Sequence, residues 1–183
     1  MNLTKSDPLL AAAQLLLFFF IGVLGFCAAL IAMSVPATLI FQDQILGEVA
    51  SQGVPASPEL IGALLMIFTC VFAMLVLGVC FMELLRRIVR TVGTGDPFIP
   101  ENAKRLSRMG WIGVAAHLVI LPLGGVAMWL MELVEDTPVA EDIRFDIDFG
   151  LDFSGILLVL ILFILARVFR TGADMREDLE GTV

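Results

Sequence analysis

Four long apolar runs divide the chain, at residues 9–35, 60–82, 109–131 and 153–166. Each of the first three exceeds the roughly 20 apolar residues that a helix needs to cross about 30 Å of hydrocarbon. The fourth reaches about residue 169 when Val168 and Phe169 are included. The pattern predicts an all-α membrane protein with four transmembrane helices, spanning about 9–35, 60–82, 109–131 and 153–169.

The basic residues gather in alternate polar segments. Of the eleven Lys and Arg residues, one lies in the amino-terminal segment, six lie in the hairpin 83–108, and three lie in the carboxyl-terminal tail. The two remaining connections, 36–59 and 132–152, contain only Arg144. Because basic loops stay on the cytoplasmic side of a membrane, this alternation predicts an up-down bundle with both termini in the cytoplasm.

Composition supports one polytopic domain over residues 1–183. Hydrophobic residues make up 59% of the chain, which is more than a soluble domain carries. The net charge of −8 is concentrated in connections 36–59 and 132–152, which hold eleven acidic residues and one basic residue. We expect no direct binding of nucleic acid, since no large basic surface is left to displace phosphate counterions.

The two acidic connections predict a small extracytoplasmic cap. Pro36 disfavours helical geometry at Val35, so we expect the first helix to end there. Residues 143–153 alternate apolar and polar positions, which is typical of a half-buried β-strand or an extended strip. A lone strand is unstable, so the cap contains short β-strands only if connection 36–59 or the bilayer surface provides a partner.

The hairpin 83–108 carries the clearest local chemistry. Glu83 is spaced to pair with Arg87 one helical turn later. The helix should end at residues 92–93, and Pro100 should open the next helix. The candidate patch for lipid headgroups or a cytoplasmic partner is Arg86, Arg87, Arg90, Lys104, Arg105 and Arg108. Headgroup contact is the simpler interpretation, and docking of a cytoplasmic protein is the more specific one.

His117 is the single histidine and the candidate functional residue at membrane depth. It shares a helical face with Gly110, Gly113 and Gly124, which predicts that it points into the bundle. It would act as a proton carrier, a metal ligand or a packing residue, and packing is favoured because a neutral histidine is inexpensive to bury. Pro122 should bend or loosen this helix.

Small residues form a stripe on the first helix, at Gly22, Gly25, Ala29 and Ala32. Their spacing of three and four residues places them on one face. Such a stripe predicts the close approach of a neighbouring helix.

Two stretches carry a resemblance to a known family. They are Gly95-Asp-Pro-Phe-Ile-Pro-Glu-Asn-Ala-Lys-Arg-Leu, followed by Arg108-Met-Gly-Trp, and the tail from Leu165 to Val183. Over residues 60–183 the chain resembles the bacterial membrane family catalogued as domain of unknown function 2975. The resemblance implies a four-helix protein of the bacterial inner membrane and a link with small helix-turn-helix regulators of the Cro/CI type, and it implies no catalytic residue. Arg170-Thr171-Gly172 stands where the family tends to have Arg-Glu-Gly.

No catalytic, cofactor-binding or metal-binding constellation is visible in the chain, and we expect a protein that is not an enzyme. The leading hypothesis is a membrane module that binds a cytoplasmic regulator or serves as an accessory subunit of a membrane assembly. One alternative is a small homo-oligomeric transporter or channel built around His117. Another is an extracytoplasmic sensor that gathers Ca²⁺ with its acidic cap. For that cap, a solvated acidic face is the favoured interpretation. The acidic residues concerned are Glu141, Asp142, Asp146, Asp148 and Asp152.

Overall fold

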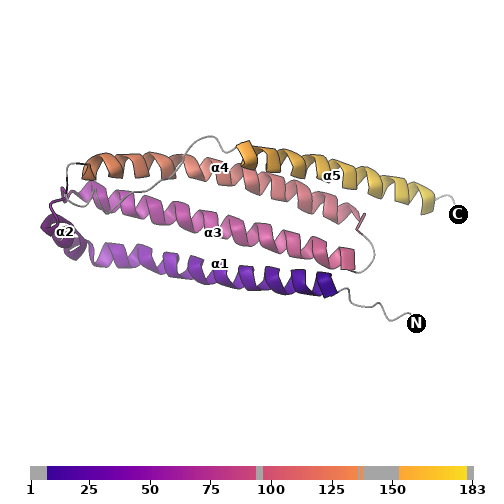
Figure 1. Ribbon diagram of the computed structural model, residues 1–183, viewed down its shortest axis with the longest axis horizontal. Coiled ribbons are helices and arrows are strands. Elements are labelled where there is room, and N and C mark those ends of the chain that lie inside the picture. Colours follow the sequence, from indigo (N-terminus) through magenta and orange to yellow (C-terminus); the bar gives the residue numbers. More distant parts are fainter. Residues whose placement is uncertain (1–7, 94–96, 136, 138–152, 181–183) are drawn as a thin grey trace. The chain divides into compact units, whose positions relative to one another are not determined.

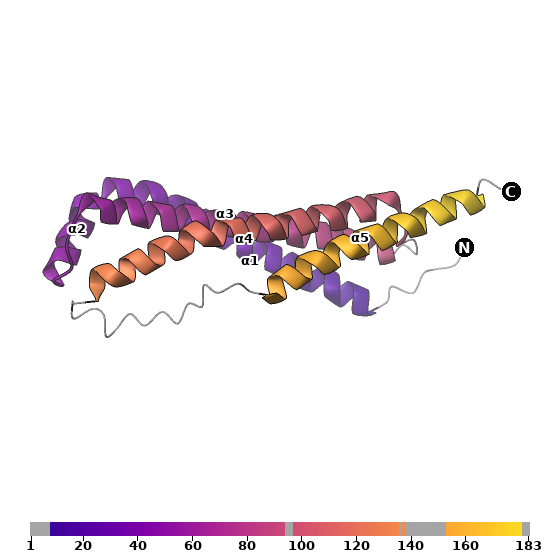
Figure 2. The same ribbon diagram turned by 90° about the horizontal axis from the view of Figure 1, so that it is seen from above.

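A computed structural model describes residues 8–93, 97–135, 137 and 153–180, and every element in this part of the chain is a helix. Figures 1 and 2 show these helices in two views. They are α1 (Pro8–Ile40), α2 (Gln42–Ser51), α3 (Pro58–Gly93), α4 (Pro100–Val134) and α5 (Phe153–Glu180). All but α2 are long and apolar enough to cross a membrane. The prediction of an all-α chain with four possible spans is confirmed. The predicted strand at 143–153 lies outside the described residues except for Phe153, which begins α5.

Helices α3 and α4 are longer than a bilayer requires. At about 1.5 Å per residue, their 36 and 35 residues correspond to more than 50 Å, against about 30 Å of hydrocarbon. The apolar stretch of α3 ends at Met82, and that of α4 begins at Met109. Their charged parts, 83–93 and 100–108, therefore extend beyond the apolar stretches as continuous helix. Both predicted helix boundaries are confirmed: α3 ends at Gly93 and α4 begins at Pro100.

The prediction that the first helix ends before Pro36 is wrong, because α1 continues to Ile40 with Pro36 inside it. Proline removes one backbone donor, yet a helix in apolar surroundings keeps its remaining hydrogen bonds because water offers no replacement. Side-chain hydroxyls add bonds around this point. Ser34 donates to the Leu30 carbonyl at 3.1 Å, and Thr38 donates to the Ser34 carbonyl at 2.8 Å.

The connection predicted at 36–59 is largely helical. After α1 it contains α2, which has Asp43 in its first turn. Gly53 then adopts a φ of 82°, a left-handed conformation that glycine accepts without strain, and the next residue, Val54, is buried. Glu59 lies in the first turn of α3. The described part of this connection is therefore mainly helix, with a tight turn at Gly53.

The chain forms two compact units, through which α1, α3 and α4 each continue. Unit 1 comprises residues 1–25, 77–115 and 152–183, and unit 2 comprises residues 26–76 and 116–151. Unit 2 is built from the end of α1, α2, the start of α3 and the end of α4. Its buried residues include Thr38, Leu60 and Cys70.

Successive helices of unit 1 run antiparallel, as contacts between residue pairs show. A Cβ on Gly110 would lie 2.9 Å from the ring of Phe163, and a Cβ on Gly113 would lie 2.5 Å from Val159. Along this contact the residue numbers rise in α4 and fall in α5, so the two helices run antiparallel. The neighbours of α1 and α3 show the same reversal, with Leu24 near Gly78 and Leu10 near Gly93. Within unit 1, the predicted up-down order is confirmed.

The core of unit 1 joins three helices. Its buried members come from α3, α4 and α5, and half-buried apolar residues surround them. The buried members are Ile88, Leu106, Met109, Leu162 and Ala166. The surrounding residues are Phe81, Leu84, Leu85 and Phe169. Met109 is 2% exposed, so the α3–α4 hairpin and α5 share one packed interior.

The small-residue stripe of α1 does not pack against another helix in the described chain. Gly22, Gly25, Ala29 and Ala32 are all exposed, and nothing lies within 4 Å of a Cβ placed on either glycine. The predicted close approach is therefore wrong within this chain. The buried residues of α1 lie elsewhere on the helix, at Leu17, Ala28 and Thr38.

Large apolar side chains cover the outside of α1. Leu15, Phe18, Phe26 and Met33 are each more than half exposed. A water-soluble protein rarely exposes so continuous an apolar surface, whereas a lipid-facing helix does so throughout. The exposed face of α1 agrees with its assignment as a membrane span.

Replacement of Gly113 by leucine should destabilise the protein, because its side chain would overlap Val159 of α5. Gly125→Leu is the matched control on the same helix, since nothing lies within 4 Å of its Cβ position. Overpacking costs about 1–3 kcal/mol, and the gain in helix propensity is shared by both variants. Thermal unfolding in detergent should show Gly113→Leu melting below Gly125→Leu. Equal melting temperatures would contradict the close α4–α5 contact.

Candidate functional site at the α3–α4 hairpin

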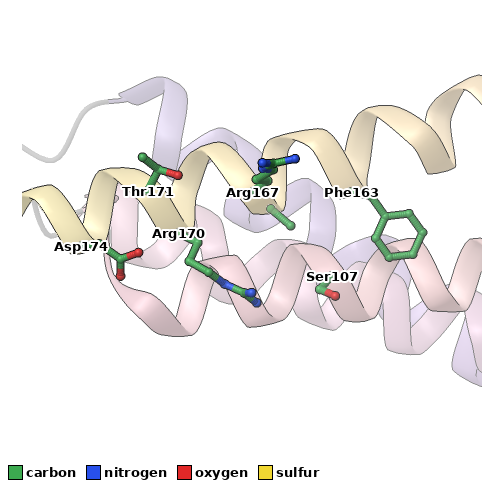
Figure 3. A pocket seen from close by; sticks show the side chains of 7 residues that line it. Ser107, Phe163, Arg167, Arg170, Thr171 and Asp174 are labelled. Carbon is green, nitrogen blue, oxygen red and sulfur yellow. The ribbon is translucent and has the colours of Figure 1, made fainter.

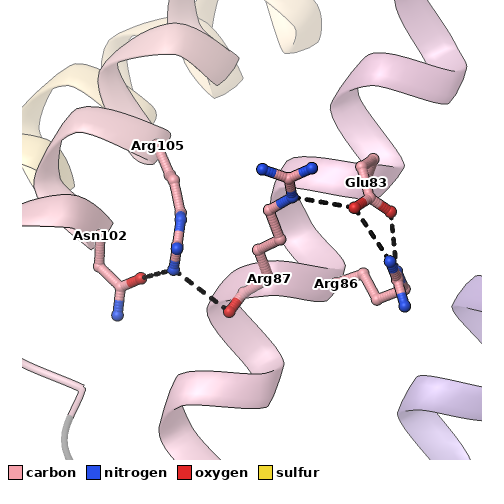
Figure 4. Close-up of polar contacts among 5 residues, drawn as sticks. All are labelled: Glu83, Arg86, Arg87, Asn102 and Arg105. Atoms are coloured by element: carbon pink, nitrogen blue, oxygen red, sulfur yellow. Dashed lines mark hydrogen bonds and ion pairs between the residues drawn. The ribbon is translucent and has the colours of Figure 1, made fainter.

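The structure divides the six predicted basic residues between two helices. Arg86, Arg87 and Arg90 lie on α3, and the other three lie on α4. Glu83 binds both Arg86 and Arg87 (Figure 4). The Arg86 Nε lies 2.7 Å from Glu83 Oε2, and the Arg87 Nε lies 2.9 Å from Oε1. The predicted Glu83–Arg87 pair is confirmed, and Arg86 joins it.

Glu83 follows the apolar run of α3 directly, where charged groups first reach the bilayer surface. Hydrogen bonds from Arg86 and then Arg87 lower the pKa of the Glu83 carboxyl from 4.5 to about 2, against a small opposing effect of desolvation. The carboxylate therefore stays ionised at any physiological pH. Two of the six cations are held along their own helix in this way.

Arg105 joins α4 to α3 through its guanidinium group. Its Nη1 donates to the Asn102 side-chain oxygen at 2.8 Å and to the backbone carbonyl of Arg87 at 3.3 Å (Figure 4). This second bond crosses from one helix of the hairpin to the other. Arg105 thus has a structural role as well as a charge.

Asn102 is the most deeply buried polar residue in the described chain, with no exposed surface. Its side-chain nitrogen donates to the Thr91 hydroxyl at 2.8 Å and to the Pro97 carbonyl at 2.9 Å. Thr91 in turn donates to the Ile88 carbonyl at 2.7 Å. Every polar atom of this side chain is therefore used, and the network ties the end of α3, the following turn and the start of α4 together.

The sequence analysis did not single out Asn102, although a signal for it exists. Asn102, Ala103, Leu106 and Met109 follow the spacing of one helical face, and all four are buried. An asparagine on a face that otherwise holds apolar residues must find hydrogen-bond partners inside the protein. The periodicity of this segment marks Asn102 as a buried network residue.

Three of the six cations remain available for a partner. Arg90, Lys104 and Arg108 are exposed, and none has an ion pair or hydrogen bond with other described residues. We call these three residues the free basic set. The predicted patch is thus only half free, because Arg86 and Arg87 pair with Glu83 on α3 and Arg105 bonds from α4 to Asn102 and to the α3 backbone.

The tail of α5 packs against the turn of the hairpin. The rings of Phe98 and Phe169 are 5.2 Å apart between centroids. Gly172 lies so close to Phe98 that a Cβ there would be 2.8 Å from the ring. The two stretches on which the family resemblance rests are therefore in contact, and Gly172 has a steric reason to be glycine.

A hollow of about 400 Å³ lies between α4 and α5 in unit 1. Ser107 lines it from α4, and Arg167, Arg170 and Asp174 line it from α5 (Figure 3). A pair between Arg170 and Asp174 would be expected from their spacing, but none forms within 4 Å. Both side chains remain directed at the hollow instead of at each other.

His117 lies half-buried on α4, and it has an interaction partner in the structure. Gly110 and Gly124, which were predicted to share its face, are buried. Pro122 lies inside α4 without ending it. Among the described residues, no cluster of three His, Cys, Asp or Glu residues suited to a metal occurs around His117 or elsewhere.

Four apolar helices of spanning length and a charged hairpin beyond them define a multi-pass membrane protein. A family model described as "Protein of unknown function (DUF2975)" matches residues 37–183, and the chain belongs to that family. The matched region begins earlier than residue 60 and so includes α2. Neither a curated protein nor a solved structure matches the chain.

Substitution of Asn102 by alanine should weaken the hairpin strongly. It removes two donated bonds and leaves the Pro97 carbonyl and Arg105 without this partner, and each buried group that loses its partner costs about 1–3 kcal/mol. Glu101→Ala is the control, because Glu101 is exposed at the adjacent position. Thermal unfolding should show a much larger loss for Asn102→Ala. Similar losses in the two variants would contradict a structural role for the network.

Glu83→Gln should remove a pH-dependent contribution to stability. Because the folded pKa of about 2 lies below the ordinary 4.5, the stabilisation is complete above about pH 4.5 and is lost as the pH falls toward 2. Its size at neutral pH should be small, below about 1 kcal/mol per pair, since both arginines are substantially exposed. Melting temperatures of wild type and variant should therefore converge on acidification. A constant difference from pH 7 to pH 3 would show that the ion pairs do not cause it.

Proposed function

We propose that this protein lies in the inner membrane of a bacterial cell with both termini in the cytoplasm. The alternation of basic and acidic segments supports this orientation, because the hairpin 83–108 and the tail carry nine of the eleven basic residues. The hairpin, its turn and the end of α5 then face the cytoplasm together.

In that orientation, the protein is a non-enzymatic module that docks a cytoplasmic regulator on its hairpin. The observation that carries this proposal is the Asn102 network, which holds the free basic set on a frame built from two helices and a turn. A preordered surface loses little conformational entropy on binding. Cations without internal partners remain available to a partner's carboxylates.

The positive charge of this surface favours a partner with an acidic surface. Arg90, Lys104 and Arg108 complement an acidic protein surface, and the family resemblance makes a small helix-turn-helix regulator the candidate. An accessory role in a larger membrane assembly would use the same surface. The transporter and sensor alternatives have no comparable support, because His117 is one half-buried histidine and most of the acidic cap lies outside the described residues.

The test is affinity purification of the tagged protein from native membranes in mild detergent. We expect a cytoplasmic protein to co-purify at low salt and to dissociate as ionic strength rises. The triple variant Arg90→Gln/Lys104→Gln/Arg108→Gln should weaken this binding by about 20-fold, from three exposed pairs of about 0.2–1 kcal/mol each. The matched control is Arg167→Gln/Arg170→Gln, which removes charge from α5 and leaves the free basic set intact.

Two results would contradict docking at this surface. One is recovery of the wild-type protein without any stoichiometric partner. The other is an equal loss of the partner in the triple variant and in the α5 control, which would indicate a response to total charge alone.

A further inference from the structure

The hollow between α4 and α5 is lined by two cations that pair with none of the described residues. Arg167 and Arg170 both line it, and neither has an ion pair or hydrogen bond with other described residues. Arg170 extends from α5 toward α4, on the side where Ser107 lies (Figure 3). The volume of about 400 Å³ falls within the range of small-molecule sites, about 300–1,000 Å³.

The lining changes character in a fixed order along α5. Phe163 and Ala166 belong to the apolar run, Arg167 and Arg170 follow, and Asp174 comes last. At about 1.5 Å per residue, Arg167 lies about 6 Å beyond Phe163, and Asp174 lies about 10 Å beyond Arg167. A phospholipid has the same order from the bilayer outward: apolar chain, anionic phosphodiester and polar headgroup.

We propose that this hollow binds one anionic phospholipid whose phosphodiester carries a hydroxylated headgroup, as in phosphatidylglycerol. Arg167 and Arg170 neutralise the phosphate, and the Ser107 hydroxyl donates to one of its oxygens. Phe163 and Ala166 contact the upper part of the acyl chains. The carboxylate of Asp174 accepts a hydrogen bond from a headgroup hydroxyl.

Asp174 explains why the site selects among anionic lipids. Phosphatidic acid, whose phosphate monoester carries more negative charge and has no headgroup hydroxyl, would meet like charge at Asp174. The hydroxyl of a glycerol headgroup would instead donate a hydrogen bond to the Asp174 carboxylate. Free inorganic phosphate shares the chemistry recognised by the arginines, but it lacks the acyl chains that contact Phe163. The lipid should therefore bind far more tightly than phosphate.

The experiment is native mass spectrometry of the full-length protein in detergent, titrated with phosphatidylglycerol, phosphatidic acid, phosphatidylcholine or inorganic phosphate. We expect one tightly bound phosphatidylglycerol. Arg167→Gln/Arg170→Gln should weaken its binding by about 25-fold, at about fivefold for each arginine near a headgroup. Arg90→Gln/Arg108→Gln is the control with the same charge loss, and it should bind the lipid as wild type does. Arg167→Lys/Arg170→Lys should restore part of the affinity, which excludes misfolding as the cause.

Asp174→Asn tests the headgroup contact separately. It should raise the affinity for phosphatidic acid at least severalfold, toward that for phosphatidylglycerol. Equal weakening by the two double glutamine variants, or phosphate binding as tight as the lipid, would overturn the proposal. The proposal is separable from partner docking, because Arg167→Gln/Arg170→Gln should lose the lipid and keep the docked partner, whereas the triple variant of the free basic set should lose the partner and keep the lipid.

Discussion

The side-chain amide of Asn102 has no access to water, and its hydrogen bonds must therefore be made inside the protein. They reach Thr91 on α3 and Pro97 in the turn, while Arg105 binds the side-chain oxygen. A shift of either helix along the other would leave a buried donor without a partner, which sets the register of the hairpin. The positions of Phe98 and the free basic set follow from that register.

Helix α5 packs against the hairpin mainly through close steric contacts at glycine residues. Gly110, Gly113 and Gly172 each lie where a side chain would collide with α4–α5 neighbours or the turn. Without such glycines, the helices could not approach this closely. Between α4 and α5 this packing still leaves the hollow that Arg167 and Arg170 line. Unit 1 therefore has basic residues in two settings, on the exposed surface of the hairpin and in the lining of the hollow beside α5.

Several features were predictable from local rules. The ends of α3 and α4 follow from Gly93 and Pro100, and the Glu83–Arg87 pair follows from helical spacing. The end of α1 was not predictable from Pro36, because the rule that proline ends a helix describes a chain in water. The failure of the Arg170–Asp174 pair has a related cause. Spacing makes a pair available, but an exposed pair is worth so little in water that it need not form.

The sequence by itself determined that four apolar helices alternate with charged segments. The reason is that burial in lipid depends on the composition of a segment, and the distance a helix can span depends on its number of residues. It also determined which residues bear charge beyond the apolar runs. Only the tertiary structure decided which of those charges are engaged: Arg86, Arg87 and Arg105 bind within the hairpin, while Arg90, Lys104 and Arg108 do not. The physical reason is that a hydrogen bond depends on the position of its partner, which for Asn102 and Arg105 is set by packing between residues on different helices.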